Sequence, residues 1–133
     1  MLKRKPKSDV PPPDWILKLE TTLAEDPRIE SVELKRQGSI EDRAFGVLVI
    51  EMPPHPEVFI MWATVNTETR ILFNKFIFEG FPGHGILEFV EQVLTDSIRI
   101  ENKGRLFRSS RLTVDVGGEP VSSDWSSGWY RAG

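Results

Sequence analysis

His84, Glu88 and Glu91 are spaced at i, i+4 and i+7, which places side chains along one side of a helix. A histidine with two carboxylates could ligate a divalent metal, and a histidine beside a glutamate could transfer a proton. A solvated helix surface gives the same pattern, and Gly85 favours a position for His84 before the helix begins. We therefore expect no catalytic residue, no metal site and no cofactor.

Other groups suited to catalysis are scarce in this chain. It has no cysteine, which excludes disulfides, thiolate ligands and cysteine nucleophiles, and its other histidine is His55, within a proline-rich turn. The glycine-rich run 80–85 could hold a phosphate on helix amides. It lacks the lysine and the spacing of a phosphate-binding loop, so a simple turn is favoured. The sequence predicts a protein that is not an enzyme.

Positive charge is concentrated in two stretches of an otherwise acidic chain. Four of the 17 basic residues fall within residues 1–7, so the remaining chain has 13 basic and 20 acidic residues. The second stretch, residues 99–111, begins at Arg99 and combines arginines with Phe107, as single-stranded nucleic-acid platforms do. In a strand, however, Arg108 would point to the opposite face from Arg105 and Arg111. This geometry favours the interpretation that the arginines are ordinary surface residues over that of a nucleic-acid platform. The alternative function is nucleic-acid association through Lys3, Arg4, Lys5, Arg105, Arg108 and Arg111.

Residues 119–133 contain three aromatic residues, Trp125, Trp129 and Tyr130, among serines and glycines. Rigid aromatic side chains on a flexible segment can anchor in a pocket of another protein. The other interpretation is that these side chains pack on their own domain. We expect this segment to be a flexible aromatic tail.

Three successive β-type runs, residues 45–52, 58–65 and 71–78, carry apolar side chains at both odd and even positions. Because successive side chains of a strand point to opposite faces of the sheet, such runs need cover on both faces. Two helices of about three turns cover roughly one face of a sheet whose strands lie ~4.8 Å apart. The second face should be covered by the C-terminal strand, a second copy of the chain or another protein.

The elements around these runs follow from periodicity and turn residues. Short polar or proline-containing breaks between the runs predict hairpins and an antiparallel meander. Helical spacing predicts one helix capped by Asp14 and ended by Pro27, and a second helix over residues 86–94. Alternation over residues 29–36 predicts an edge strand, and residues 106–116 predict one or two closing strands.

The predicted fold class is therefore α+β, with an antiparallel meander of about four to six strands and two helices packed on one face. A disordered basic and proline-rich tail (residues 1–13) should precede a single domain (residues 14–118) and the flexible tail (residues 119–133). No apolar run approaches the ~20 residues that span a bilayer, and no apolar segment follows the basic N-terminus. We expect a cytoplasmic protein, or a nuclear one in a eukaryotic host.

The function that these patterns favour is non-catalytic protein binding, as an inhibitor, adaptor, immunity-type or chaperone-like module. The predicted binding residues are Phe59, Met61 and Phe76 in the sheet and Trp125, Trp129 and Tyr130 in the tail. The predicted partner is another protein or a second copy of the chain in a dimer. Nucleic acid is the less favoured partner, and no membrane contact is expected.

Overall fold

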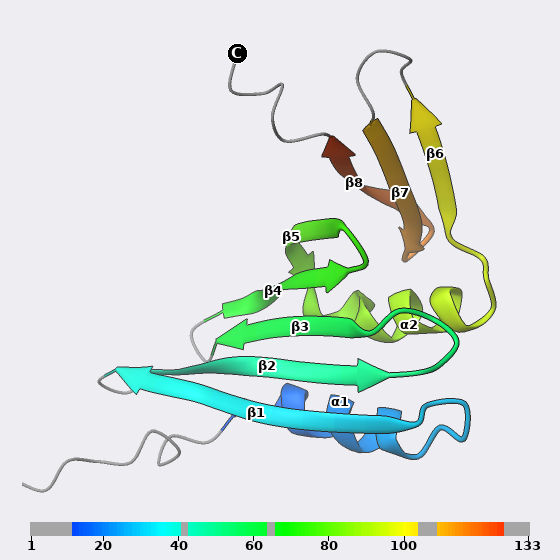
Figure 1. Cartoon of the computed structure of the whole chain (residues 1–133). Coiled ribbons are helices and arrows are strands. Elements are labelled where there is room, and N and C mark those ends of the chain that lie inside the picture. The colour runs from blue at the N-terminus through cyan, green and yellow to red at the C-terminus, as the bar shows by residue number, and fades with distance from the viewer. Residues whose placement is uncertain (1–11, 41–42, 64–65, 104–108, 127–133) are drawn as a thin grey trace, which may run out of the picture.

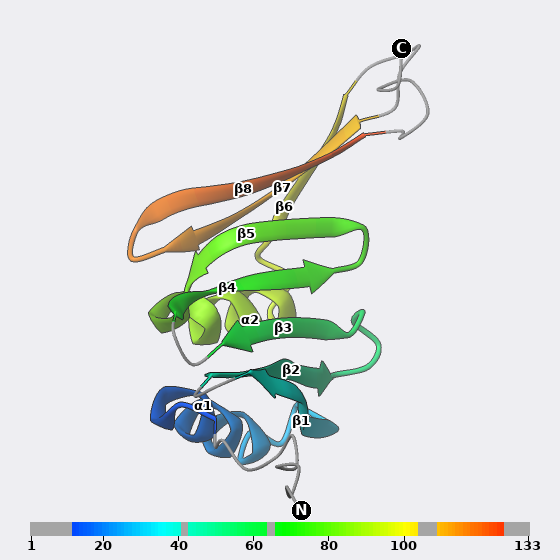
Figure 2. The same cartoon turned by 90° about the vertical axis from the view of Figure 1, so that its left-hand side faces the viewer.

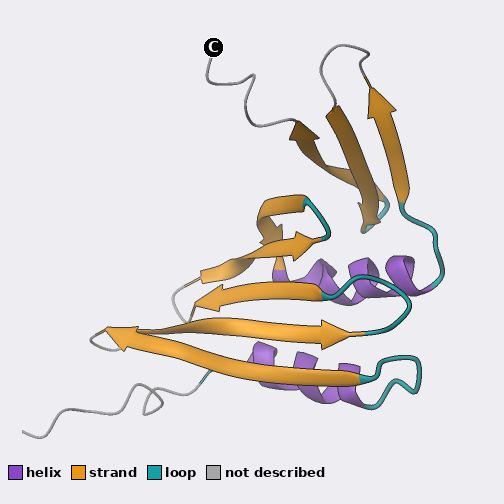
Figure 3. Ribbon diagram, in the orientation of Figure 1, coloured by secondary structure: helices purple, strands orange, loops and turns teal. Residues whose placement is uncertain are grey.

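The computed structural model describes residues 12–40, 43–63, 66–103 and 109–126. These residues contain two α-helices, a short 3-10 turn and eight strands in two antiparallel sheets (Figures 1 and 3). The order is α1 (Asp14–Ala24), β1 (Ser31–Ile40), β2 (Arg43–Glu51), β3 (Val58–Ala63), β4 (Asn66–Phe73), β5 (Phe76–Pro82), η2 (Gly83–Gly85), α2 (Ile86–Leu94), β6 (Arg99–Lys103), β7 (Ser109–Val116) and β8 (Glu119–Ser126). The α+β class and the antiparallel meander predicted from the sequence are confirmed.

Strands β1 to β5 form the larger sheet, sheet A, in which each strand pairs with the next along the chain. β1 lies at an edge of this sheet, as its alternating pattern predicted. The run 71–78 is two strands rather than one, because Asn74 and Lys75 form a two-residue turn between β4 and β5. Asn74 has a φ of 58°, a left-handed conformation that asparagine tolerates well. Residues 66–69, expected to be a break, are the beginning of β4.

Both helices pack against the same face of sheet A and lie behind the strands in the view of Figure 1. The buried residues of α2 are Ile86, Phe89, Val90 and Val93, and those of α1 are Ile16, Leu19 and Leu23. Asp14 does not cap α1: Pro13 is the N-cap, and its carbonyl accepts hydrogen bonds from the amides of Ile16 and Leu17. Neither of these described helices is long and apolar enough to cross a membrane.

The core between sheet A and the helices is centred on four phenylalanines. The ring of Phe89 on α2 makes edge-to-face contacts with Phe73, Phe78 and Phe81, with centroids 5.6 to 5.8 Å apart. Each of the four side chains is at most 3% exposed. Such pairs contribute ~0.5–1.5 kcal/mol each beyond the burial of their surface. The cluster therefore holds α2 firmly on β4 and β5.

Strands β6, β7 and β8 form a second sheet, sheet B, which packs on α2 and beside β5 (Figure 2). The apolar residues that join it to the common core are Leu112, Val114 and Val116 of β7. The Gln92 side chain on α2 donates to the Asp115 carbonyl at 2.6 Å and accepts from the Asp115 amide at 2.9 Å. The Ser123 hydroxyl on β8 donates to the Ile77 carbonyl of β5 at 2.6 Å. These bonds place sheet B at the β5 side of sheet A.

The first part of the expected C-terminal tail is a strand. Residues 119–126 form β8, which pairs with β7 through a hairpin at Gly117 and Gly118. These glycines have φ values of 60° and 85°, and a two-residue type I′ hairpin turn requires positive φ at both of its central residues. The domain boundary that we placed after residue 118 therefore falls within this hairpin. The serine-rich composition of β8 suggested a flexible segment and so concealed the strand. In the structure, serine hydroxyls of β8 bond to neighbouring strands, as in the 2.8 Å contact of Ser122 with Thr113.

Candidate functional site

Sheet A has a second face, which we call the open face, on the side away from the helices. Because side chains alternate along a strand, the pairing register assigns residues to each face. Two rows cross the open face from β1 to β5: Glu33, Val49, Phe59, Leu72 and Ile77 in the first, and Lys35, Val47, Met61, Arg70 and Glu79 in the second. Phe45 and Ala63 pair beyond the second row. The middle of the open face is therefore largely apolar.

The apolar side chains of the open face remain partly in water. Phe45 is 42% exposed and Ile77 is 49% exposed. The half-buried residues between them are Val47, Val49, Phe59, Met61 and Leu72. A hollow of about 470 Å³ lies over β2, β3 and β4 and is lined mainly by these side chains. With ~200 Å² of surface on a phenylalanine, the exposed fraction of Phe45 is ~80 Å², worth ~2 kcal/mol if it were buried.

No segment among the described residues covers the open face. The core cluster joins both helices, sheet B and the other face of sheet A. The partly buried apolar residues packed against this cluster are Trp15, Val32, Leu34, Leu94, Ile98, Val121 and Trp125. None of them belongs to the open face. The C-terminal strand β8, which could have covered the open face, packs beside β5 instead.

Charged residues near the two sides of the open face form ion pairs within the chain. Lys35 Nζ lies 3.9 Å from Glu33 Oε1 near the β1 edge. Arg70 Nε lies 3.0 Å from Glu79 Oε1 on β4 and β5. The open face therefore carries both signs of charge at each side of its apolar middle.

A pair of glutamates lies at one end of the open face. The Ser31 hydroxyl donates to Glu51 Oε1 at 2.6 Å, and this bond lowers the pKa of Glu51. The pKa of the neighbouring Glu57 is raised, chiefly because it shares a hydrogen bond with the Glu51 carboxylate. One carboxyl of this pair therefore keeps its proton to a higher pH than an isolated glutamate would.

Of the residues predicted to bind a partner, Phe59 and Met61 lie on the open face. Phe76 does not: it is 1% exposed and faces the helices, so its assignment to the binding face was wrong. The physical reason is the turn at residues 74–75, which starts a new strand and changes which positions face the core. Trp125 lies in β8 and packs on its own domain, with Lys75 Nζ 4.1 Å from the centre of its ring.

The predicted tail residues Trp129 and Tyr130 lie outside the described residues. So do Lys3, Arg4, Lys5, Arg105 and Arg108 of the predicted nucleic-acid surface. The structure thus leaves these predictions untested.

The two described arginines of residues 99–111 are paired with carboxylates in sheet B. Arg111 Nε lies 2.7 Å from Asp124 Oδ1, and Arg99 bonds to Asp115 at 3.2 Å. The Arg99 contact lowers the pKa of Asp115. Nearby carboxylates therefore offset much of the positive charge that this part of the nucleic-acid surface would need.

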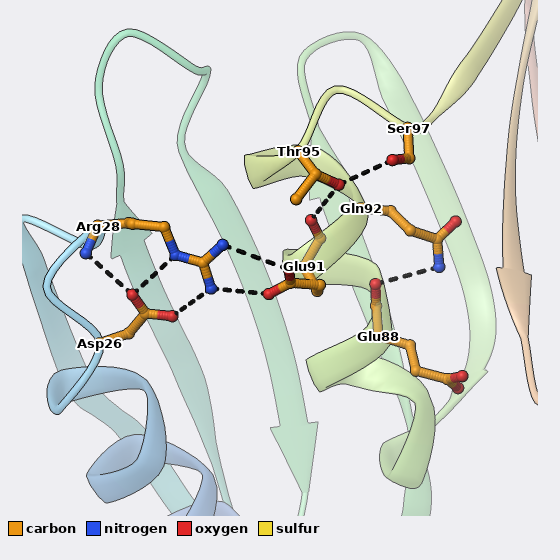
Figure 4. A network of polar contacts seen from close by, with 7 residues as sticks. All are labelled: Asp26, Arg28, Glu88, Glu91, Gln92, Thr95 and Ser97. Atoms are coloured by element: carbon orange, nitrogen blue, oxygen red, sulfur yellow. Dashed lines mark hydrogen bonds and ion pairs between the residues drawn. The ribbon is translucent and has the colours of Figure 1, made fainter.

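The side chains of His84, Glu88 and Glu91 have separate surroundings. His84 is exposed in the turn before α2, and the Glu88 carboxylate accepts a 3.0 Å hydrogen bond from the Gly117 amide. Glu91 accepts a 2.7 Å hydrogen bond from Arg28 (Figure 4), which lowers the pKa of Glu91. Within the described ranges, no group of three or more His, Cys, Asp or Glu side chains could hold a metal ion.

Arg28 joins the end of α1 to α2. Its guanidinium donates to Asp26 at 2.7 Å and to Glu91 at 2.7 Å (Figure 4). The side-chain and backbone bonds from Arg28 lower the pKa of Asp26 to about 2. Arg28 and Glu91 are exposed and Asp26 is half-buried, so the network supports the fold from the surface.

Sequence reasoning missed a cleft of about 610 Å³ between α1 and the residues at the start of α2. Its lining residues are Trp15, Lys18, Leu19, Thr22, Pro82, Gly83, His84 and Leu87. The cleft exists because the sheet holds the two helices apart, which no periodicity in the sequence reports. Its lining combines apolar walls with the polar side chains of Lys18, Thr22 and His84.

Three comparisons with known proteins found no match to this chain, neither among family models, nor among curated proteins, nor among solved structures.

Proposed function

We propose that this protein is a non-catalytic protein-binding module and that the open face of sheet A is its binding surface. The observation that carries the proposal is the set of apolar side chains, from Phe45 to Ile77, that the described residues leave uncovered. Contiguous apolar surface in water is unfavourable and usually marks a surface that another molecule covers.

The composition of the open face suits a protein partner. Aromatic residues and methionine are enriched in the centres of protein interfaces, and Phe59 and Met61 occupy the central strand here. Charged residues lie toward the sides, as in an interface rim. Small-molecule sites are typically concave and bury most of the ligand. The open face of a sheet is better suited to the broad surface of another protein. We place this activity in the cytoplasm, because the chain has no cysteine and disulfides are rare in cytosolic proteins.

Photo-crosslinking in the host cell tests this proposal. Replacing Phe45 by a photoreactive phenylalanine analogue keeps an aromatic ring on the open face. Ile100 is the matched control position, because it is 48% exposed, close to the 42% of Phe45, but lies on β6 of sheet B. We expect irradiation to give a discrete protein adduct from position 45 and none from position 100.

Two results would contradict the proposal. One is the absence of any discrete adduct from position 45 although the protein is folded and abundant. The other is the same set of adducts from both positions, which would indicate random collision rather than a binding surface.

A further inference from the structure

We propose that the open face binds a second copy of this chain, so that two molecules pack sheet A against sheet A in a symmetric dimer. The inference rests on the proposed function, because it names the partner of the same surface. Its support comes from the position of the apolar strands, the arrangement of the charges and the area of the face.

The apolar centre of the face coincides with the middle of the sheet. β3 has two strands on either side, and it carries Phe59 and Met61 on the open face. A twofold dimer uses the same patch on both copies. When two faces pack together, the twofold axis lies in the plane between them. An axis along β3 places Phe59 and Met61 against the same residues of the second copy, at the point where water is best excluded.

One pair of opposite charges on the open face matches under this symmetry. The axis along β3 brings β1 of one molecule over β5 of the other, since these strands lie equally far from the middle. Lys35 on β1 then lies opposite Glu79 of the second copy, in the same row of the register, and the contact occurs twice. Val49 similarly lies opposite Leu72 of the second copy. A second copy thus supplies apolar surface for the middle of the face and an opposite charge for Lys35 and Glu79. Glu33 and Arg70, which lie opposite Ile77 and Val47, keep their ion pairs within the chain.

The area of the face is sufficient for a reversible dimer. Five strands ~4.8 Å apart and about six residues long, at ~3.3 Å per residue, make a face of roughly 500 Å² on each copy. The total of ~1,000 Å² lies at the lower limit for a specific interface. We therefore expect a dimer that forms at micromolar concentrations and dissociates on dilution.

The edges of sheet A are less suited to self-association than its open face. The β5 edge lies beside β8, whose Ser123 hydroxyl bonds to the Ile77 carbonyl. The β1 edge carries the exposed charged side chains Glu33 and Lys35, which oppose pairing between edges.

Sedimentation velocity on the purified full chain tests the proposal over low micromolar to millimolar concentrations. We expect the mass to rise from 15.2 kDa toward twice this value as the concentration increases. Ile77→Glu places a charge in the interface from each copy and should raise the dissociation constant at least tenfold. Ile100→Glu is its matched control, because the two isoleucines are 49% and 48% exposed but only Ile77 is on the open face.

Crosslinking through an introduced cysteine provides a second test that does not depend on a disruptive variant. The chain has no cysteine of its own, so Met61→Cys adds a single thiol to the open face. Packed sheets lie ~10 Å apart, beyond the reach of a disulfide, so a short bismaleimide reagent is required. We expect a covalent dimer from Met61→Cys and not from Ile100→Cys at the same concentration.

The outcomes separate this proposal from the proposed function. A constant mass of 15.2 kDa at all concentrations overturns the dimer. The proposal also fails if the Ile77→Glu variant dimerises as strongly as the wild type, because another surface would then be responsible. If the purified chain stays monomeric while the probe at Phe45 captures a different protein, the dimer fails and the protein-binding role stands. If that probe captures nothing, both fail.

Discussion

The two faces of sheet A predict very different costs for the same substitution. Ile71 in β4 faces the helices and is 0% exposed, whereas Ile77 in β5 is on the open face and is 49% exposed. Both residues lie in the same hairpin, so an isoleucine-to-alanine change alters side-chain size and strand propensity equally at the two positions. The difference between the variants therefore measures burial.

The expected costs follow from the environments of the two side chains. Ile71→Ala removes a fully buried side chain and leaves a cavity, which costs about 2–5 kcal/mol. Ile77→Ala removes a side chain that is already half in water, so its transfer term is about 1 kcal/mol in the dilute monomer. Domains of this kind have about 5–15 kcal/mol of total stability, so the first variant should lose a large part of it.

Urea unfolding at low micromolar protein concentration, followed by circular dichroism, measures both variants. We expect the free energy of unfolding to differ between them by about 1–4 kcal/mol, with Ile71→Ala the less stable. Equal losses would refute the assignment of the two faces. At high concentration the wild type should gain stability from self-association, and Ile77→Ala should gain less.

Three further predictions concern the parts of the fold that support the open face. Gly46→Ala would place a methyl group against the backbone carbonyl oxygen of Lys35 and 2.7 Å from Cζ2 of Trp62, so calorimetry should show a loss of about 1–3 kcal/mol or more, and an unchanged Tm would contradict this packing. Phe89→Ala should cost about 3–5 kcal/mol by the same measurement, because it removes the centre of the phenylalanine cluster, and a loss below 1 kcal/mol would contradict that role. Arg28→Gln should lower the Tm at neutral pH. Because Arg28 lowers the pKa of Asp26 from 3.8 to about 2, its contribution is present above pH 4 and is lost as the pH falls toward 2. The two Tm values should converge near pH 2, and a constant difference would contradict the network.

Local patterns in the sequence were sufficient for several elements. The apolar stripe over residues 86–94 matched α2, because a helix buries residues at a fixed spacing. The alternation in residues 29–36 matched the edge strand β1. These predictions succeeded because each depends on contacts between near neighbours and one buried surface.

Other features depend on contacts that local patterns do not report. The turn at Asn74 and Lys75 lies between apolar residues on both sides, so the run resembled one long strand and Phe76 was placed on the wrong face. When a strand is apolar at every position, alternation cannot distinguish its core face from its open face. The position of sheet B is set by tertiary contacts of Gln92 and Ser123. The cleft between the helices likewise follows from their spacing on the sheet.

Oxidation of methionine offers the most direct test that the open face is covered in the cell. Met61 lies half-buried on the open face, whereas Met52 is 0% exposed in the core and serves as an internal reference. Met61 should be oxidised much faster than Met52 in dilute purified protein, and its oxidation in intact cells should be strongly slowed, as read by mass spectrometry. The quantity to compare is the oxidation rate of Met61 divided by that of Met52. If this ratio is the same in cells as in the dilute protein, nothing binds the open face in the cell.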